Sequence, residues 1–223
     1  MKTHLFEDPV LFWVGNVPVT ETMCTSTIVT CVIAVAAATM GIVVRRSPRH
    51  WLAVLAMWIV ETLDQQVQQI VGHPERAVST LAGSLFLFIA GCNLAGQLPG
   101  IQPATGNLAT SSALAAIVFL AVPIAGVRAQ GGWNYVKHYF RPNPLLMPLH
   151  LISELSRTLA LSVRLFGNVL SGHLIVAILV SLAGLLVPMP LMALDLLIGL
   201  LQAYIFAVLA TVYIGAAISA GEE

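Results

Sequence analysis

Several ionisable side chains fall inside the last two long apolar stretches of the sequence, among them Glu154, Arg157, Arg164, His173 and Asp195. A charge near the centre of a bilayer costs about 2.5–3.5 kcal/mol on insertion scales, so such residues usually line a water path or pair with each other. The apolar sequence around Arg164 is long on both sides, which argues against snorkelling of its head group to the interface. We interpret Arg164 as functional, with an internal salt bridge as the alternative.

The spacing of these residues separates a cation from a proton-exchanging pair. If the two stretches are antiparallel helices, one register pairs His173 with Asp195 and Arg164 with Gln202 to within two residues. An imidazole, with an unperturbed pKa of about 6.5, is suited to passing a proton to a carboxylate, whereas His173 alone would suit a hydrogen-bonded interior histidine equally well. Nine helical steps place His173 and Arg164 on opposite faces. The residues that share the arginine's face are Arg157, Arg164, Asn168 and Ser171.

The elements that hold these residues must be membrane helices. The chain has 223 residues, of which 58% are hydrophobic and 9% charged, and its mean hydropathy is +0.89. Soluble domains carry about 25% charged residues, so the composition excludes an ordinary soluble fold. Ten Lys and Arg balance ten Asp and Glu, which argues against nucleic acid as a partner. The three cysteines show no paired framework and are interpreted as small apolar residues.

Apolar runs long enough to cross about 30 Å of hydrocarbon predict five membrane helices. They cover residues 26–44, 78–98, 108–127, 145–187 and 191–220. As straight helices the last two would be about 65 and 45 Å long, which exceeds the hydrocarbon, so they are either oblique or broken. We therefore predict an all-α polytopic membrane protein with one membrane domain over residues 1–223. Its last two helices form a long, oblique antiparallel hairpin that carries the ionisable residues.

Residues 51–71 predict a sixth helix of a different kind. Its later half has apolar residues at three- and four-residue steps among Glu, Asp and Gln, which makes one apolar stripe on a polar helix. Such a helix lies along the membrane interface better than it spans the bilayer.

The positions of Lys and Arg orient the chain. The basic cluster at residues 45–49 and the loop that holds Arg128, Lys137 and Arg141 are expected on the cytoplasmic side. The connections at residues 99–107 and 188–190 carry no charge and suit the opposite side. Five spans then put residues 1–25 outside as a retained N-terminal segment, with no cleaved signal, and the C-terminus in the cytoplasm.

At residues 161–168 the sequence reads LSVRLFGN and continues with Ser171-Gly172-His173, and this run resembles the signature of subunit a of the F-type ATP synthase. The motifs GQLPG at 96–100 and LQAYIF at 201–206 are similar to further parts of that family, and residues 61–66 resemble its amphipathic second helix. The resemblance covers about residues 20–220, and its RLFGN core around a membrane arginine is highly specific.

This resemblance implies roles for the central polar residues. Arg164 matches the family's essential stator arginine, Gln202 the glutamine near it, and Asn168 the asparagine one turn beyond. One position departs from the pattern, because Arg157-Thr158 stands where many members have Lys-Pro. That departure leaves the local helix geometry open.

The resemblance also implies two access paths. His173 and Asp195 match the pair that lines the outer path, with acid and histidine in one of the permitted arrangements, and Glu154 matches an acidic position of the inner path. No catalytic residue, metal ligand or cofactor is expected, since the sequence has no GxxxxGK[ST], HExxH or GxSxG motif.

The resemblance implies a non-catalytic, ion-translocating stator subunit with two offset half-channels that load and unload carboxylates on a rotor ring. Its implied partners are the ring of small c-type subunits, the b-type subunits of the peripheral stalk, the lipid bilayer, and transported H⁺ or Na⁺. The expected location is a bacterial inner membrane. The alternatives are a self-contained ion channel or secondary transporter, which would more often show an inverted repeat, and a scaffold subunit whose buried charges only fix assembly.

Overall fold

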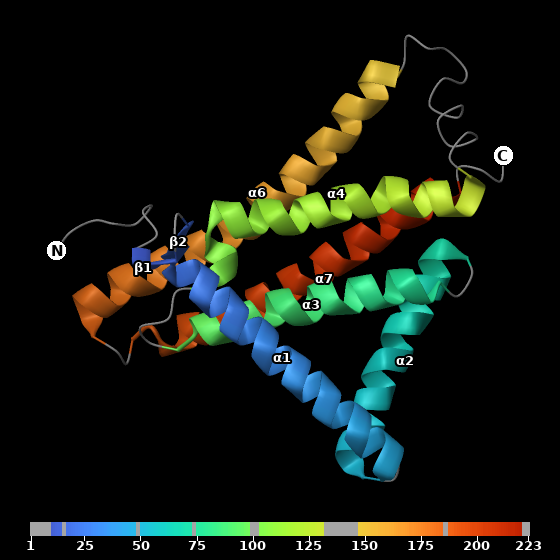
Figure 1. The fold of residues 1–223 in the computed structure, drawn as a ribbon. Helices are drawn as coiled ribbons and strands as arrows, with labels where there is room; N and C mark the ends of the chain where they lie inside the picture. Colours follow the sequence, from blue (N-terminus) through green and yellow to red (C-terminus); the bar gives the residue numbers. More distant parts are fainter. Residues whose placement is uncertain are drawn as a thin grey trace.

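The computed structural model describes residues 10–14, 17–47, 50–72, 75–98, 103–131, 147–184 and 187–219. The fold within them is all-α apart from one short β-hairpin, as Figure 1 shows. The elements are β1 (Val10–Val14), β2 (Val17–Thr20), α1 (Glu21–Arg46), α2 (Trp51–Val71), α3 (Arg76–Gly96), the short 3₁₀ helix η1 (Ala104–Gly106), α4 (Leu108–Gln130), α6 (Met147–Ala183) and α7 (Met189–Ser219). Five of the described helices, all but α2 and η1, are long and apolar enough to cross a membrane. The predicted fold class is confirmed.

The hairpin of β1 and β2 was not anticipated. The two strands are antiparallel and lead directly into α1, which begins five residues before the predicted span at residue 26. The Thr20 side chain caps this start by accepting a hydrogen bond from the Met23 amide at 3.4 Å. The hydroxyl of Thr25 donates to the Glu21 carbonyl at 3.0 Å, so the polar start of the helix is extended at little cost.

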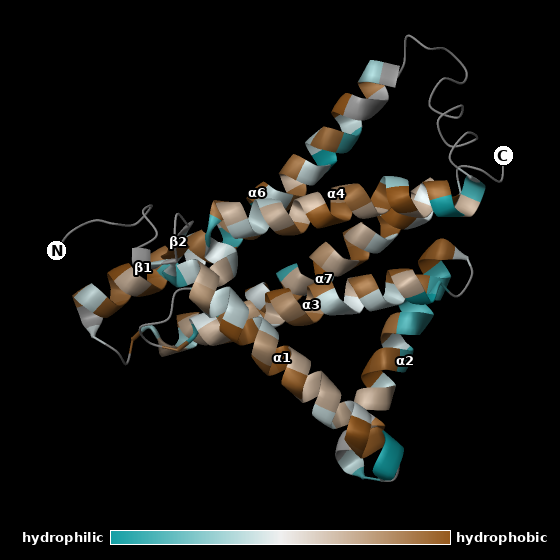
Figure 2. Ribbon diagram, viewed as in Figure 1, coloured by the Kyte–Doolittle hydropathy of each residue, from teal (hydrophilic) through white to brown (hydrophobic). Residues whose placement is uncertain are grey.

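Helix α2 has the bounds predicted for the interfacial helix, and in Figure 1 it runs from the far end of α1 to the end of α3. Two of its buried side chains, Val67 and Val71, pack in one cluster with Ile214 of α7. Figure 2 shows its second half as mostly hydrophilic, in contrast to the apolar middle of α7. The helix ends at Gly72, whose φ of 87° is strained for residues with a side chain.

Helices α3, α4 and α7 form the packed centre of the molecule. Ile89 of α3 and Phe206 of α7 are fully buried, and Val118 of α4 completes their cluster. Helix α6 joins this core through one face only, with Leu161 and Leu165 packed into it. The core therefore fixes α7 firmly and α6 along a narrow stripe.

The last two helices are long and unbroken, which decides between the two alternatives that the sequence left open. Helix α6 has 37 residues and α7 has 31, or about 55 and 46 Å of helix. Both begin and end within a few residues of the predicted limits, 145–187 and 191–220. In Figure 1, α6 passes obliquely across α4.

Candidate functional site

The register of α6 against α7 is the one that the spacing of polar residues predicts. Gly172 of α6 faces the Asp195 carboxylate, and a Cβ built on Gly172 would lie 2.7 Å from Asp195 Cγ. His173, the next residue, is half-buried and within electrostatic reach of Asp195. The structure thus brings His173 and Asp195 to the same crossing, although within the described residues no hydrogen bond joins the two side chains.

The partner that holds Asp195 comes from a third helix. Gln97, at the C-terminal end of α3, donates a hydrogen bond from Nε2 to Asp195 Oδ2 at 3.0 Å. The preceding Gly96 lies against His173, because a Cβ at Gly96 would stand 3.0 Å from His173 Nε2. The end of α3 therefore contacts both members of the predicted pair. Sequence reasoning missed Gln97 as a site residue, although it lies in the GQLPG motif that carried part of the resemblance.

A buried polar chain lies one turn further into the molecule. Asn93 of α3 donates to the Gly199 carbonyl of α7 at 2.8 Å and accepts a hydrogen bond from the Thr105 hydroxyl at 3.0 Å. Ser111 of α4 donates to the Thr105 carbonyl at 2.7 Å. Asn93, Thr105 and Ser111 are all buried, so each bond replaces water that the interior excludes. This chain joins α3, η1, α4 and α7 beside the Asp195 site.

Arg164 lies on the face of α6 that the described part of the chain leaves uncovered. Arg157, Arg164 and Ser171 are exposed, and Asn168 at the edge of this face is half-buried. The opposite face is in the core, where Leu165 is fully buried. The structure agrees with the predicted sharing of a face, and it directs the arginine away from the chain's own core.

Gln202 of α7 lies on a different face from Arg164, although the register of the two helices brings their positions level. Its side chain is 5% exposed, on the core face of α7 next to Ala203 and Phe206, and its Nε2 has no hydrogen-bond partner among the described residues. No hydrogen bond joins Gln202 to Arg164 in the described part of the chain. The register brings the two positions level, but their side chains belong to different faces.

The first turns of α6 contain Glu154 and also Arg157-Thr158, which stand where many members of the family that the sequence resembles have Lys-Pro. The Thr158 hydroxyl donates to the Glu154 carbonyl at 3.0 Å, so the helix continues regularly through the position where a proline would remove a backbone donor. The Arg157 guanidinium lies over the Tyr213 ring of α7, with its Cζ 5.5 Å from the ring centroid, in a cation–π contact. Glu154 itself is half-buried.

Comparison with known proteins decides the family. The family model for the ATP synthase A chain matches residues 21–215, which is most of the sequence and includes every residue of the candidate site. The chain belongs to the ATP synthase A chain family. This confirms the resemblance carried by the RLFGN motif.

Individual relatives in the A chain family match over nearly the whole chain. ATP synthase subunit a 2 of Bradyrhizobium sp. is 39% identical over 98% of this chain and 97% of its own length. ATP synthase subunit a 1 of Prosthecochloris aestuarii is 42% identical over 99% of this chain and 100% of its own length. ATP synthase subunit a 2 of Picosynechococcus sp. is 43% identical over 86% of this chain and 82% of its own length. With its five apolar helices, this A chain family member is an integral membrane protein.

Proposed function

We propose that this chain is the ion-translocating stator subunit of an F-type ATP synthase. The observation that carries the proposal is the placement of Arg164, a cation in the middle of a long apolar helix, on a face that none of the described residues covers. A cation at that depth needs a counter-charge. The carboxylates of a rotor ring of c-type subunits, which belong to other chains, would supply it.

On the outer side, His173 and Asp195 pass the ion from water to a ring carboxylate. Their place where α6 meets α7 supports this role, because the two side chains share one half-buried, polar corner with Gln97. A ring carboxylate that has taken up the ion is neutral and can rotate into lipid. After nearly a full turn the same site reaches the inner path beside Glu154 and releases the ion.

Arg164 separates the two paths. Its charge favours the ionised form of the carboxylate beside it, and Coulomb attraction of this kind is strong where water is excluded. The same charge repels a cation that would leak directly between the paths. Each unit charge that crosses gains about 2.3 kcal/mol per 100 mV of membrane potential.

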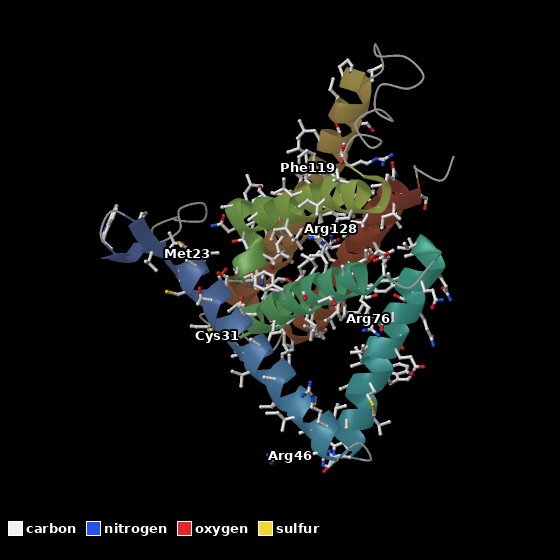
Figure 3. The ribbon with its side chains drawn as sticks, turned by 45° about the vertical axis from the view of Figure 1, so that its right-hand side comes forward. Met23, Cys31, Arg46, Arg76, Phe119 and Arg128 are labelled. Carbon is white, nitrogen blue, oxygen red and sulfur yellow. The ribbon has the colours of Figure 1, made fainter. Side chains whose placement is uncertain are left out.

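The proposed orientation places the N-terminal hairpin outside and the C-terminus in the cytoplasm of a bacterial inner membrane. Figure 3 supports this by showing Arg46 at the far end of α1, where the chain turns into α2, and Met23 at the end near the hairpin. Arg76 and Arg128, at the start of α3 and in the last turn of α4, belong to the same side by chain order. Peripheral-stalk subunits of the b type are the other proposed partners, and the transported ion is H⁺ or Na⁺.

The test replaces Arg164 by Ala in the assembled complex. ATP-driven ion pumping into inverted membrane vesicles should fall to background, whereas the ATPase activity of the soluble sector should persist. Arg128→Ala is the matched control, since it removes an exposed arginine from the end of α4 and should leave pumping unchanged. Normal pumping by Arg164→Ala would remove this residue from the mechanism. Pumping by the purified chain without partners would favour a self-contained channel or transporter instead.

A further inference from the structure

The side chain of Gln97 is aimed at Asp195 by the backbone of α3. Gln97 is the C-cap residue of α3, and its own amide nitrogen donates to the carbonyls of Leu94 and Ala95. Its position is therefore set by the helix rather than by a flexible loop. From there Nε2 reaches Asp195 Oδ2 at 3.0 Å, and the Gln97 side chain is partly buried.

Two glycines make this approach possible. A Cβ at Gly96 would lie 2.7 Å from the Cβ of Pro103 and 3.0 Å from His173 Nε2, so a larger residue there would push α3 away from α6. Gly172 leaves room for the Asp195 carboxylate, whose Oδ1 is the atom nearest to it. One carboxylate oxygen thus points to α3 and the other to α6.

A second hydrogen bond from a side-chain amide of α3 to α7 lies one helical turn away from the bond between Gln97 and Asp195. Asn93 lies four residues before Gln97 on α3, and Gly199 lies four residues after Asp195 on α7. The bond from Asn93 Nδ2 to the Gly199 carbonyl, at 2.8 Å, therefore fixes the same antiparallel register as the bond from Gln97 to Asp195. Because Asn93 and Gly199 are buried, this register is part of the folded core.

We propose that Gln97 is a positioning residue for the Asp195 carboxylate. Its amide binds Oδ2 and leaves Oδ1 directed towards α6, on the side where His173 stands. The ion that Asp195 exchanges then always meets the same oxygen. This inference rests on the proposed function, because it assigns Gln97 to the outer path through Asp195.

A double-mutant cycle tests the inference in the assembled complex. Gln97→Met keeps the length of the side chain and removes the amide donor, and it should lower ATP-driven pumping per assembled complex about tenfold, as expected for a lost hydrogen bond to a charged group. In an Asp195→Asn background, the same Gln97→Met change should cause no further loss. Gln97→Glu, which also lacks the amide donor, serves in place of Gln97→Met if that variant assembles poorly.

The matched control is Gln130→Met. Gln130 also donates from its side-chain amide to α7, at the carbonyl of Ala217 and 2.9 Å away, but at the opposite end of that helix. The Gln130→Met variant should keep pumping within about twofold of the unchanged protein, because a single hydrogen bond from a neutral side chain to a backbone carbonyl contributes little.

The outcomes separate the two proposals. Normal pumping by Gln97→Met, or an equal loss with and without the Asp195 carboxylate, would overturn the role of Gln97 while Asp195 kept its own. Normal pumping by Asp195→Asn would overturn the outer path itself, and the role of Gln97 with it.

Discussion

Helices α7 and α6 have similar lengths and form one hairpin, yet they are packed very differently. In the apolar stretch of α7, 44% of the residues are buried inside the chain, against 11% in α6. The polar groups around α7 find partners within the molecule, as the bonds of Asn93 and Gln97 show. The arginines of α6 lie on its exposed side.

Exposure of apolar side chains does not by itself indicate a protein partner in a membrane. Lipid tails are as apolar as leucine, so Val163 or Ile178 on α6 could face lipid without cost. Arg164 could not, because a lone charge there is unfavourable by several kcal/mol. Under the proposed function, the cation, rather than the exposed apolar surface, marks the face of α6 that another subunit covers.

The largest effect on stability is expected for a side chain on the buried face of α7. Phe206 of α7 is fully buried, and Phe206→Ala should lower the free energy of unfolding in mixed micelles by about 2–3 kcal/mol. This is less than in a water-soluble core, because the side chain leaves one apolar medium for another. Leu201→Ala, on the exposed side of the same helix, should change it by less than about 0.5 kcal/mol. Equal losses in the two variants would contradict the difference in packing within α7.

The next effect is a loss of ion pumping, and it concerns His173 and Asp195, where α6 meets α7. Replacing His173 or Asp195 alone by Ala should lower ion pumping about tenfold or more, as typical for a lost proton-exchanging group. Exchanging the two residues should retain more pumping than either single replacement, because the pair stays at the same crossing. Pumping assays on the three variants, normalised to assembled complex, check this. An equal loss in all three would argue against a shared proton.

The smallest effect concerns the cation–π contact between Arg157, on the exposed face of α6, and Tyr213 of α7. Tyr213→Leu removes the ring beneath Arg157 and should cost about 0.5–1 kcal/mol of stability, the usual size of an exposed cation–π contact. Tyr204→Leu on the same helix, exposed and away from that guanidinium, is the control. Thermal unfolding of both variants in the same detergent measures the difference. A larger loss at Tyr204 would show that the contact contributes nothing specific.

Much of this fold could be predicted because one physical requirement dominates it. A chain in lipid must satisfy its backbone within helices, so apolar runs located every long helix to within a few residues. The start of α1 was predicted five residues late, since the Thr-rich turn before residue 26 looks polar, although the Thr25 hydroxyl is paired with the Glu21 carbonyl. The β-hairpin escaped prediction because it is too short to show a clear alternating pattern.

The part of the candidate site formed by α6 and α7 could be predicted from the sequence, whereas the part contributed by α3 could not. The register of α6 on α7 followed from residue spacing, and Gly172 does face Asp195. The contribution of α3 did not follow, because spacing along one hairpin carries no information on how a distant helix packs against it. Gln97 and Asn93 could be assigned only once that packing was seen. The transport roles of all six predicted residues stay predictions: Arg164, His173, Asp195, Gln202, Asn168 and Glu154.

Helix α6 is about 55 Å long, nearly twice the hydrocarbon thickness, and Arg164 stands at its midpoint. A rod of that length leaning through the membrane meets the two surfaces at widely separated points, while its centre stays at the same depth whatever the lean. The length of the helix and its tilt together set the sideways displacement between the two ends. Under the proposed function, this displacement sets the two ends of the ion path apart along the circumference of the ring, and the number of residues in one helix limits how large it can be.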